Sequence, residues 1–136
     1  MIQSADDAPP GDLPADVRAR IEGEIRSAFD RYETALMAND VDALMALFWD
    51  DPRTVRLTAQ GGAYGVEEIA RFRQARDTSD IARSLTRVEI TALSLNIGYA
   101  NAEYRRTGSG RIGAQSHLWI RTPDGWKIAS AHVSLS

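Results

Sequence analysis

The chain has 136 residues, of which 43% are hydrophobic and 26% charged, with a formal net charge of -3 and no cysteine. This length and composition are typical of a single globular domain. They exclude disulfide and thiolate chemistry and a transmembrane segment, and they argue against a nucleic-acid partner. We therefore expect a soluble, cytoplasmic protein, with a flexible N-terminal lead over residues 1–12 and one domain over residues 13–136.

Two helices are predicted in the first third of the chain. Six apolar residues recur there at three- and four-residue steps: Val17, Ile21, Ile25, Phe29, Tyr32 and Leu36. This stripe predicts a long helix over residues 14–38, with Pro14 in its first turn. Asp40 can then cap a short second helix, and Pro52 ends the helical pattern.

The remaining elements are mostly strands. Residues 54–59 and 63–64 predict a strand pair around a glycine turn, and residues 66–76 predict a third helix with Ile69 and Phe72 on its inner face. Four strand-like runs follow, separated by turn residues: 84–93, 97–106, 111–121 and 126–134.

This order of elements predicts an α+β fold, with three N-terminal helices packed on a strongly curved antiparallel sheet. Long antiparallel strands curl, so the helices would cover a concave face and enclose a pocket. The opposite face is expected to carry Trp119 or Trp126 among polar groups, and a partly apolar face of this kind invites dimerisation.

The stretch FWDDPRTVR, residues 48–56, carries two arginines where a helix leads into a strand. Side chains alternate along a strand, so Arg53 and Arg56 point to opposite faces and only one can line a pocket. The polar face of Arg56 either lines the pocket or meets solvent, and the apolar pattern of Val55 and Leu57 by itself favours solvent. If Arg56 lines the pocket, Arg53 is expected to pair with a nearby acid.

Two further arginines border the apolar stripe of the third helix. Arg73 and Arg76 lie beside Ile69 and Phe72, whereas Arg71 points away. Arginines converging on one cavity would suit a dianionic substrate, because a guanidinium binds a carboxylate through two hydrogen bonds. The alternative is that both side chains extend along the helix edge into solvent.

Tyr32 is either a core tyrosine or a proton donor. His132 would share a strand face with Trp126, and it is either a satisfied sheet histidine or a pocket group. Tyr64, on the short return strand, is a further candidate for substrate contact.

The histidines lack metal-ligand spacing and no phosphate-binding loop is present, so neither metal nor cofactor is expected.

The order of elements resembles the NTF2-like fold that SnoaL-type cyclases share with ketosteroid isomerase. Within that superfamily, four motifs are similar to the AtzH-like family, which includes HpxZ, a protein of oxalurate catabolism: LFWDDPRTVR, AYGVEEIARFRQAR, RIGAQSHLWIR and GWKIASAHVSL. The resemblance covers residues 21–135, nearly the whole predicted domain.

The resemblance implies a homodimer, encoded beside amidases, that acts without a cofactor on a ureido-carboxylate. The reactions associated with the family are conversion of 1,3-dicarboxyurea to allophanate and oxalurate breakdown, by decarboxylation or hydrolysis. It also implies that Tyr32 and Arg56 are the catalytic pair, which favours Arg56 in the pocket.

Four residues are expected to bind the substrate: Tyr64, Arg73, Arg76 and His132. Two alternatives remain open, a non-catalytic binding protein or accessory partner of an amidase, and a different small-molecule lyase or isomerase. A pocket without converging arginines would favour the lyase or isomerase.

Overall fold

The computed structural model describes residues 8–136, and this part of the chain forms three helices and six strands. In chain order they are α1 (Ala15–Ala38), α2 (Val41–Met45), β1 (Val55–Thr58), β2 (Gly61–Tyr64), α3 (Val66–Ala75), β3 (Arg83–Ala92), β4 (Ile97–Arg106), β5 (Ile112–Thr122) and β6 (Gly125–Leu135). The predicted α+β order is confirmed.

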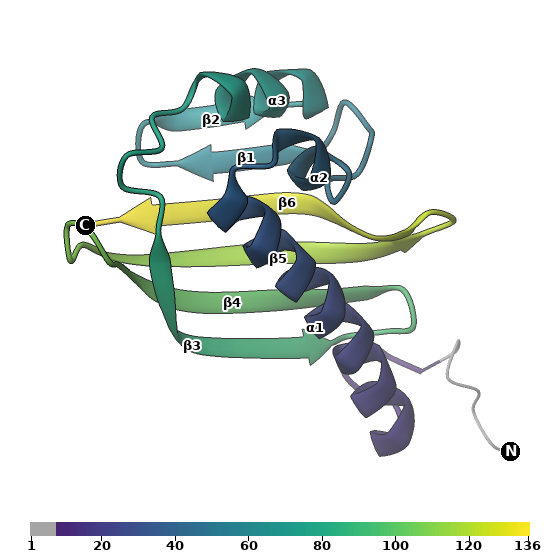
Figure 1. The fold of residues 1–136 in the computed structure, drawn as a ribbon. Helices are drawn as coiled ribbons and strands as arrows, with labels where there is room; N and C mark the ends of the chain where they lie inside the picture. Colours follow the sequence, from purple (N-terminus) through teal and green to yellow (C-terminus); the bar gives the residue numbers. More distant parts are fainter. Residues whose placement is uncertain (1–7) are drawn as a thin grey trace, which may run out of the picture.

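The strands form one sheet in the order β2-β1-β6-β5-β4-β3 (Figure 1). Neighbouring strands are antiparallel except for β1 and β6, which run in parallel with Arg56 opposite Ala131. After the β1–β2 hairpin, α3 and the following loop carry the chain to the far edge, and β3 to β6 return strand by strand. The last strand, β6, therefore pairs with the first strand, β1.

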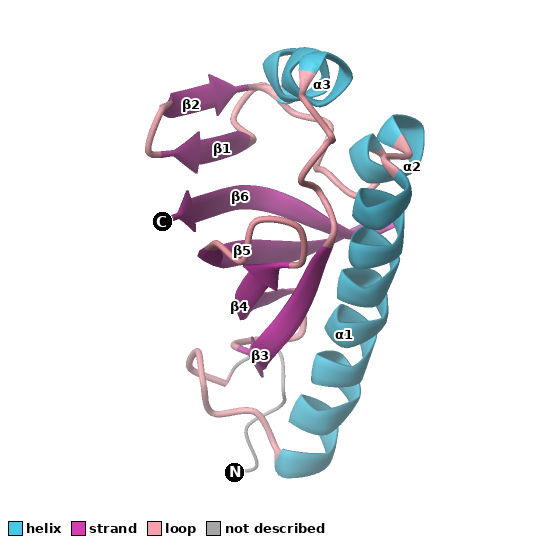
Figure 2. Ribbon diagram, turned by 60° about the vertical axis from the view of Figure 1, so that its left-hand side comes forward, coloured by secondary structure: helices cyan, strands magenta, loops and turns pink. Residues whose placement is uncertain are grey.

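The helices cover one face of the curved sheet, with α1 packed along it and α3 lying over the β1–β2 end (Figure 2). Ile21 and Ile25 of α1 are fully buried in the same core as Trp119 and Trp126. The expectation that one of these tryptophans lies on the opposite face is wrong, because both bury their rings on the helix-covered side. The opposite face instead exposes smaller apolar residues such as Leu118.

A bulge in β6 reverses the alternation of its side chains. The register with β5 shifts between Leu118 and Trp119, which leaves Ala129 as an extra residue in β6. Such a bulge turns the following residues to the other face. Trp126 therefore faces the helices, whereas His132, beyond the bulge, is exposed on the outer face. The expected shared face for these two residues is wrong, because it assumed a regular strand.

Part of the predicted N-terminal lead, residues 1–7, lies outside the described residues. Within residues 8–12, the Gly11 N–H donates to the Leu93 carbonyl at 2.9 Å, and Leu13 is buried. In the described part of the chain, no helix is both long enough and apolar enough to span a membrane.

Candidate functional site

A cavity of about 630 Å³ lies between α3, the β1–β2 hairpin and the ends of β4 and β6. A smaller inner chamber of about 20 Å³ adjoins it, a volume that holds about one water molecule or one carboxylate oxygen. The residues that line both spaces come from β1, the end of α3, β4 and β6: Arg56, Arg76, Tyr104, Arg106 and Val133.

Three arginines gather around one aromatic ring at the boundary between the two spaces. The guanidinium carbon of Arg56 lies 4.3 Å from the centroid of the Phe72 ring, and those of Arg73 and Arg76 lie at 5.7 and 5.6 Å. The negative face of the ring attracts these cations. Phe72 is 37% exposed, and Arg73, which is 1% exposed, takes the buried position beside Ile69. The expectation of Phe72 on the inner face is therefore wrong.

Burial and mutual repulsion make this cluster unfavourable for positive charge. Burial, followed by the positive charge of Arg73, lowers the pKa of Arg56 and of Arg76 to about 10 each. Both guanidiniums stay protonated near neutral pH, so their charge is concentrated where little water screens it. An anion placed among them would relieve the repulsion.

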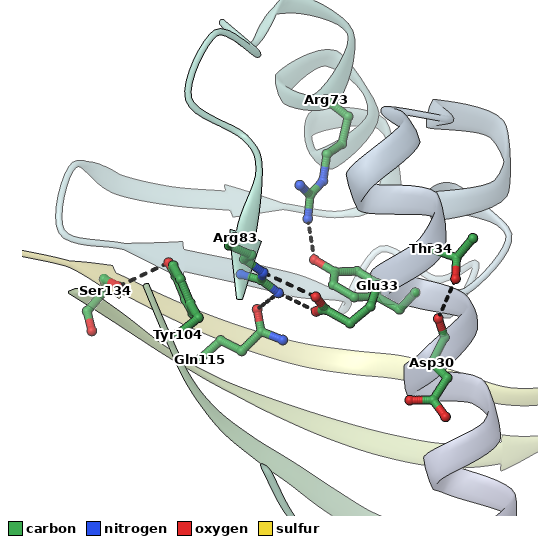
Figure 3. A network of polar contacts seen from close by, with 9 residues as sticks. Asp30, Glu33, Thr34, Arg73, Arg83, Tyr104, Gln115 and Ser134 are labelled. Carbon is green, nitrogen blue, oxygen red and sulfur yellow. Dashed lines mark hydrogen bonds and ion pairs between the residues drawn. The ribbon is translucent and has the colours of Figure 1, made fainter. Parts of the chain in front are cut away.

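Tyr32 lies at the back of this cluster and is itself buried. Nη2 of Arg73 donates to the Tyr32 hydroxyl at 2.7 Å, and Figure 3 shows Arg73 reaching from α3 toward α1. The Tyr32 ring packs edge-on against His117, with centroids 4.7 Å apart. Complete burial lowers the pKa of His117 to about 3, assisted by nearby arginines. His117 is thus a neutral support for Tyr32 at neutral pH.

A second group of polar residues closes the inner chamber from β3 and β5. Arg83 pairs with Glu33 of α1 and donates through Nη2 to Oε1 of Gln115 at 2.9 Å (Figure 3). Its guanidinium carbon lies 4.3 Å from the centroid of the Tyr104 ring. Arg106 donates to the backbone carbonyl of Asp80. The ion pair with Arg83 compensates the negative charge of Glu33.

Four residues that line the inner chamber were not predicted from the sequence: Arg83, Tyr104, Arg106 and Gln115. Tyr104 follows the small buried residues Ala100 and Ala102 on one face of β4, and Gln115 shares a face of β5 with His117. The alternation of small residues in β4 was therefore the sequence pattern that could have identified Tyr104 as inward-facing. It indicates which face is inward and says nothing about which strands meet there.

Of the predicted site residues, the structure brings Tyr32, Arg56, Arg73 and Arg76 together. Arg53 is exposed and pairs with Asp51 at 2.8 Å, so the prediction that it pairs with a nearby acid is confirmed.

Two of the expected substrate-binding residues lie outside both cavities. Tyr64 is 62% exposed on the edge strand β2, and the bulge in β6 turns His132 to the outer face. Their positions do not match the expectation that Tyr64 and His132 bind a substrate in the pocket. Arg71 was expected to point away from the pocket, but it lines the outer cavity. Within residues 8–136, no cluster of three or more histidine, aspartate or glutamate side chains forms a metal-ligand set.

A family model described as AtzH-like matches residues 16–136, almost the entire described chain. The chain belongs to the AtzH-like family. Among curated proteins, no match to the sequence is found.

Three solved structures share the fold of this chain. A protein with unknown function from Pectobacterium atrosepticum SCRI1043 is 45% identical, with a TM-score of 0.81 over 90% of this chain and 93% of that chain. A cystatin-like fold protein from Burkholderia xenovorans LB400 is 36% identical, with a TM-score of 0.80 over 85% and 92%. An NTF2-like superfamily protein from Salmonella enterica serovar Typhimurium LT2 is 23% identical, with a TM-score of 0.70 over 85% and 91%. The predicted NTF2-like fold is confirmed.

In this AtzH-like chain the site combines concentrated positive charge with two buried tyrosines, Tyr32 and Tyr104. Among residues 8–136, Glu68 is the only carboxylate that lines either cavity, and it accepts a hydrogen bond from the Tyr64 N–H at 3.2 Å. The arrangement can bind a small anion, stabilise negative charge that develops on it, and transfer a proton through Tyr32.

Proposed function

We propose that this AtzH-like protein is a cofactor-independent enzyme that acts on a small ureido-carboxylate of the 1,3-dicarboxyurea or oxalurate type. The observation that carries the proposal is the convergence of Arg56, Arg73 and Arg76 beside the hydroxyl of Tyr32. A ureido-dicarboxylate supplies two negative charges on a small planar skeleton. It would offset the repulsion among these buried cations and match their planar donor geometry.

Decarboxylation of an N-carboxylate, which 1,3-dicarboxyurea carries and oxalurate lacks, is the reaction that this set of residues supports best. When an N-carboxylate loses carbon dioxide, the carbon–nitrogen bond breaks and its electron pair stays on the urea nitrogen, which then takes up one proton. The urea oxygen shares the developing charge, and a guanidinium beside it stabilises that charge in a site with little water. Hydrolysis needs a base to activate water, and among residues 8–136 the only carboxylate that lines the two spaces, Glu68, belongs to the outer cavity.

Each residue then has a separate task. Arg56 polarises the urea oxygen or the adjacent carboxylate, and Arg76 holds the second carboxylate. Tyr32 donates the proton, and the Nη2 donor of Arg73, 2.7 Å from its oxygen, stabilises the phenolate left behind. Protonation from solvent restores the hydroxyl. Arg73 thus acts on Tyr32 rather than as a clamp for the second anion.

The test is direct incubation of the purified protein with freshly prepared 1,3-dicarboxyurea and, separately, with oxalurate, while released carbon dioxide and the organic product are measured. We expect turnover without added metal or cofactor. Arg56→Ala should lower kcat by about 10²- to 10³-fold, because it removes one preorganised charged donor. Tyr32→Phe should lower kcat by a similar or larger factor.

Arg53→Ala is the matched control, because Arg53 belongs to the same sequence motif and is exposed on the turn before β1. It should turn over substrate at the wild-type rate. Absence of turnover with both compounds, or undiminished turnover by Arg56→Ala, contradicts the enzymatic proposal. Co-purification with an adjacent amidase and no activity alone would support the accessory role instead.

The proposal extends to a cytoplasmic homodimer, as the family resemblance implies. The outer sheet face exposes Leu57, Ile112 and Leu118, an apolar surface of the kind that dimers bury.

A further inference from the structure

Several residues that line the inner chamber carry buried hydrogen-bond donors that lack a partner within the protein. Four buried nitrogen atoms of residues that line the chamber have no acceptor: Nε of Arg56, Nε of Arg73, Nε of Arg106 and Nε2 of Gln115. Buried donors are nearly always paired, because an unpaired one loses its hydration without compensation. Every one of these four groups requires an acceptor.

Gln115 lines the chamber, and its neighbours fix the orientation of its side-chain amide. Arg83 donates to the amide at 2.9 Å, and a guanidinium has only donors, so the amide atom that it contacts must be the oxygen. Arg83 is fixed in turn by Glu33, to which its Nε donates at 3.2 Å (Figure 3). The amide is therefore locked in one orientation. Gln115 is 3% exposed, so its two N–H groups cannot be satisfied by bulk solvent.

We propose that the inner chamber is an anion subsite for one carboxylate of the ligand and that Gln115 is its specificity-determining residue. A carboxylate presents only acceptors, which match the donors that the lining residues carry. An amide or hydroxyl group would bring its own N–H or O–H against these donors. The small chamber volume admits one oxygen of a carboxylate, and the outer cavity takes the remainder of the molecule.

This inference deepens the proposed function and rests on it for the location of the substrate, but it does not depend on turnover. Malonate, an unreactive dicarboxylate, tests binding alone, and malonamide is its neutral counterpart, with amides in place of both carboxylates. Calorimetric titration of the wild-type protein should show malonate bound at least about tenfold more tightly than malonamide, as expected for hydrogen bonds to a charged group.

Two substitutions separate a ligand contact from a structural role. Gln115→Met removes the donor and adds no charge, and it should weaken malonate binding by about 10- to 100-fold. Gln115→Glu keeps an acceptor for Arg83 but turns a second acceptor toward the chamber, so malonate binding should be lost. Its melting temperature should equal or exceed that of the wild type, because the added negative charge lies among arginines.

If Gln115 has only a structural role, the equally stable glutamate variant should retain malonate binding. The proposal is overturned if the wild type binds malonate no better than malonamide, or if Gln115→Met binds malonate within twofold of the wild type. If Gln115→Met does not fold, retained malonate binding by Gln115→Glu overturns the proposal by itself. Intact malonate binding without turnover of 1,3-dicarboxyurea would refute only the enzymatic proposal.

Discussion

Phe72 lies at the centre of the cationic cluster and holds its three arginines together. Arg56, Arg73 and Arg76 repel one another, and each lies within 6 Å of the centroid of the Phe72 ring. Cation–π attraction to a partly desolvated ring contributes about 0.5–2 kcal/mol for each cation. The ring thus opposes the repulsion that would otherwise disperse these side chains.

Phe72→Leu should therefore weaken malonate binding by about 2- to 30-fold, because the guanidiniums lose the ring that orients them. Phe72→Tyr should restore most of the affinity, since the aromatic face is kept. Both variants should unfold at close to the wild-type urea concentration, because the position is 37% exposed. Affinity is measured by calorimetric titration and stability by circular dichroism.

Leu118 provides the matched control for Phe72. It is also 37% exposed, but it lies on the outer face of the sheet. Leu118→Ala should leave malonate affinity unchanged. Equal affinity in Phe72→Leu and the wild type would show that the arginines keep their positions without the ring.

At the scale of elements, close contact between neighbouring strands shapes the cavity wall. Gly113 of β5 lies against the buried ring of Tyr104 of β4, and a Cβ added to it would meet ring atoms at 2.2–2.5 Å. Tyr104 lines both the outer cavity and the inner chamber. Only a residue without a side chain leaves room for the ring in that position.

Gly113→Ala should displace Tyr104, destabilise the protein by about 1–3 kcal/mol through overpacking, and weaken malonate binding. The free energy of unfolding is measured by urea denaturation and the affinity by titration. Gly23→Ala is the control, because Gly23 lies within α1 and an added Cβ meets no atom within 4 Å. It should stabilise the protein by up to about 1 kcal/mol. Wild-type stability and affinity in Gly113→Ala would contradict this account of the wall.

The sequence predicted the elements well, because their signals are local. The apolar stripe placed α1 to within one residue, and the side chain of Asp40 caps α2 by accepting from the Ala43 N–H at 3.1 Å. The bulge at Ala129 was not predicted, because a bulge depends on the register between two strands. That single extra residue moved His132 from the expected site to the outer face.

At the scale of the whole molecule, burial of His117 links stability to pH. Its pKa falls from 6.5 to about 3, mainly through burial and further through Arg83, Arg73 and Arg56. Between those pH values the unfolded chain binds a proton that the folded chain does not. The free energy of unfolding must therefore decrease as pH falls from about 6.5 toward 3, by up to about 1.4 kcal/mol per pH unit.

His117→Gln should reduce this slope, because glutamine does not titrate. The free energy of unfolding is measured by urea denaturation at several values between pH 4 and pH 7, and the slopes are compared rather than the absolute stabilities. His132→Gln, at the exposed histidine, is the control and should keep the wild-type slope. Identical slopes in His117→Gln and the wild type would refute the buried neutral histidine.

The sequence by itself determined the α+β order, the positions of the helices and strands, and the opposite directions of Arg53 and Arg56. These follow from periodicity and turn residues over short stretches of chain. The tertiary structure alone decided which side chains meet. The Arg73–Tyr32 bond joins residues 41 apart in sequence, and Arg83 and Glu33 are 50 apart. Such contacts depend on strand register, the parallel β1–β6 pair and the placement of α3, which no local pattern encodes.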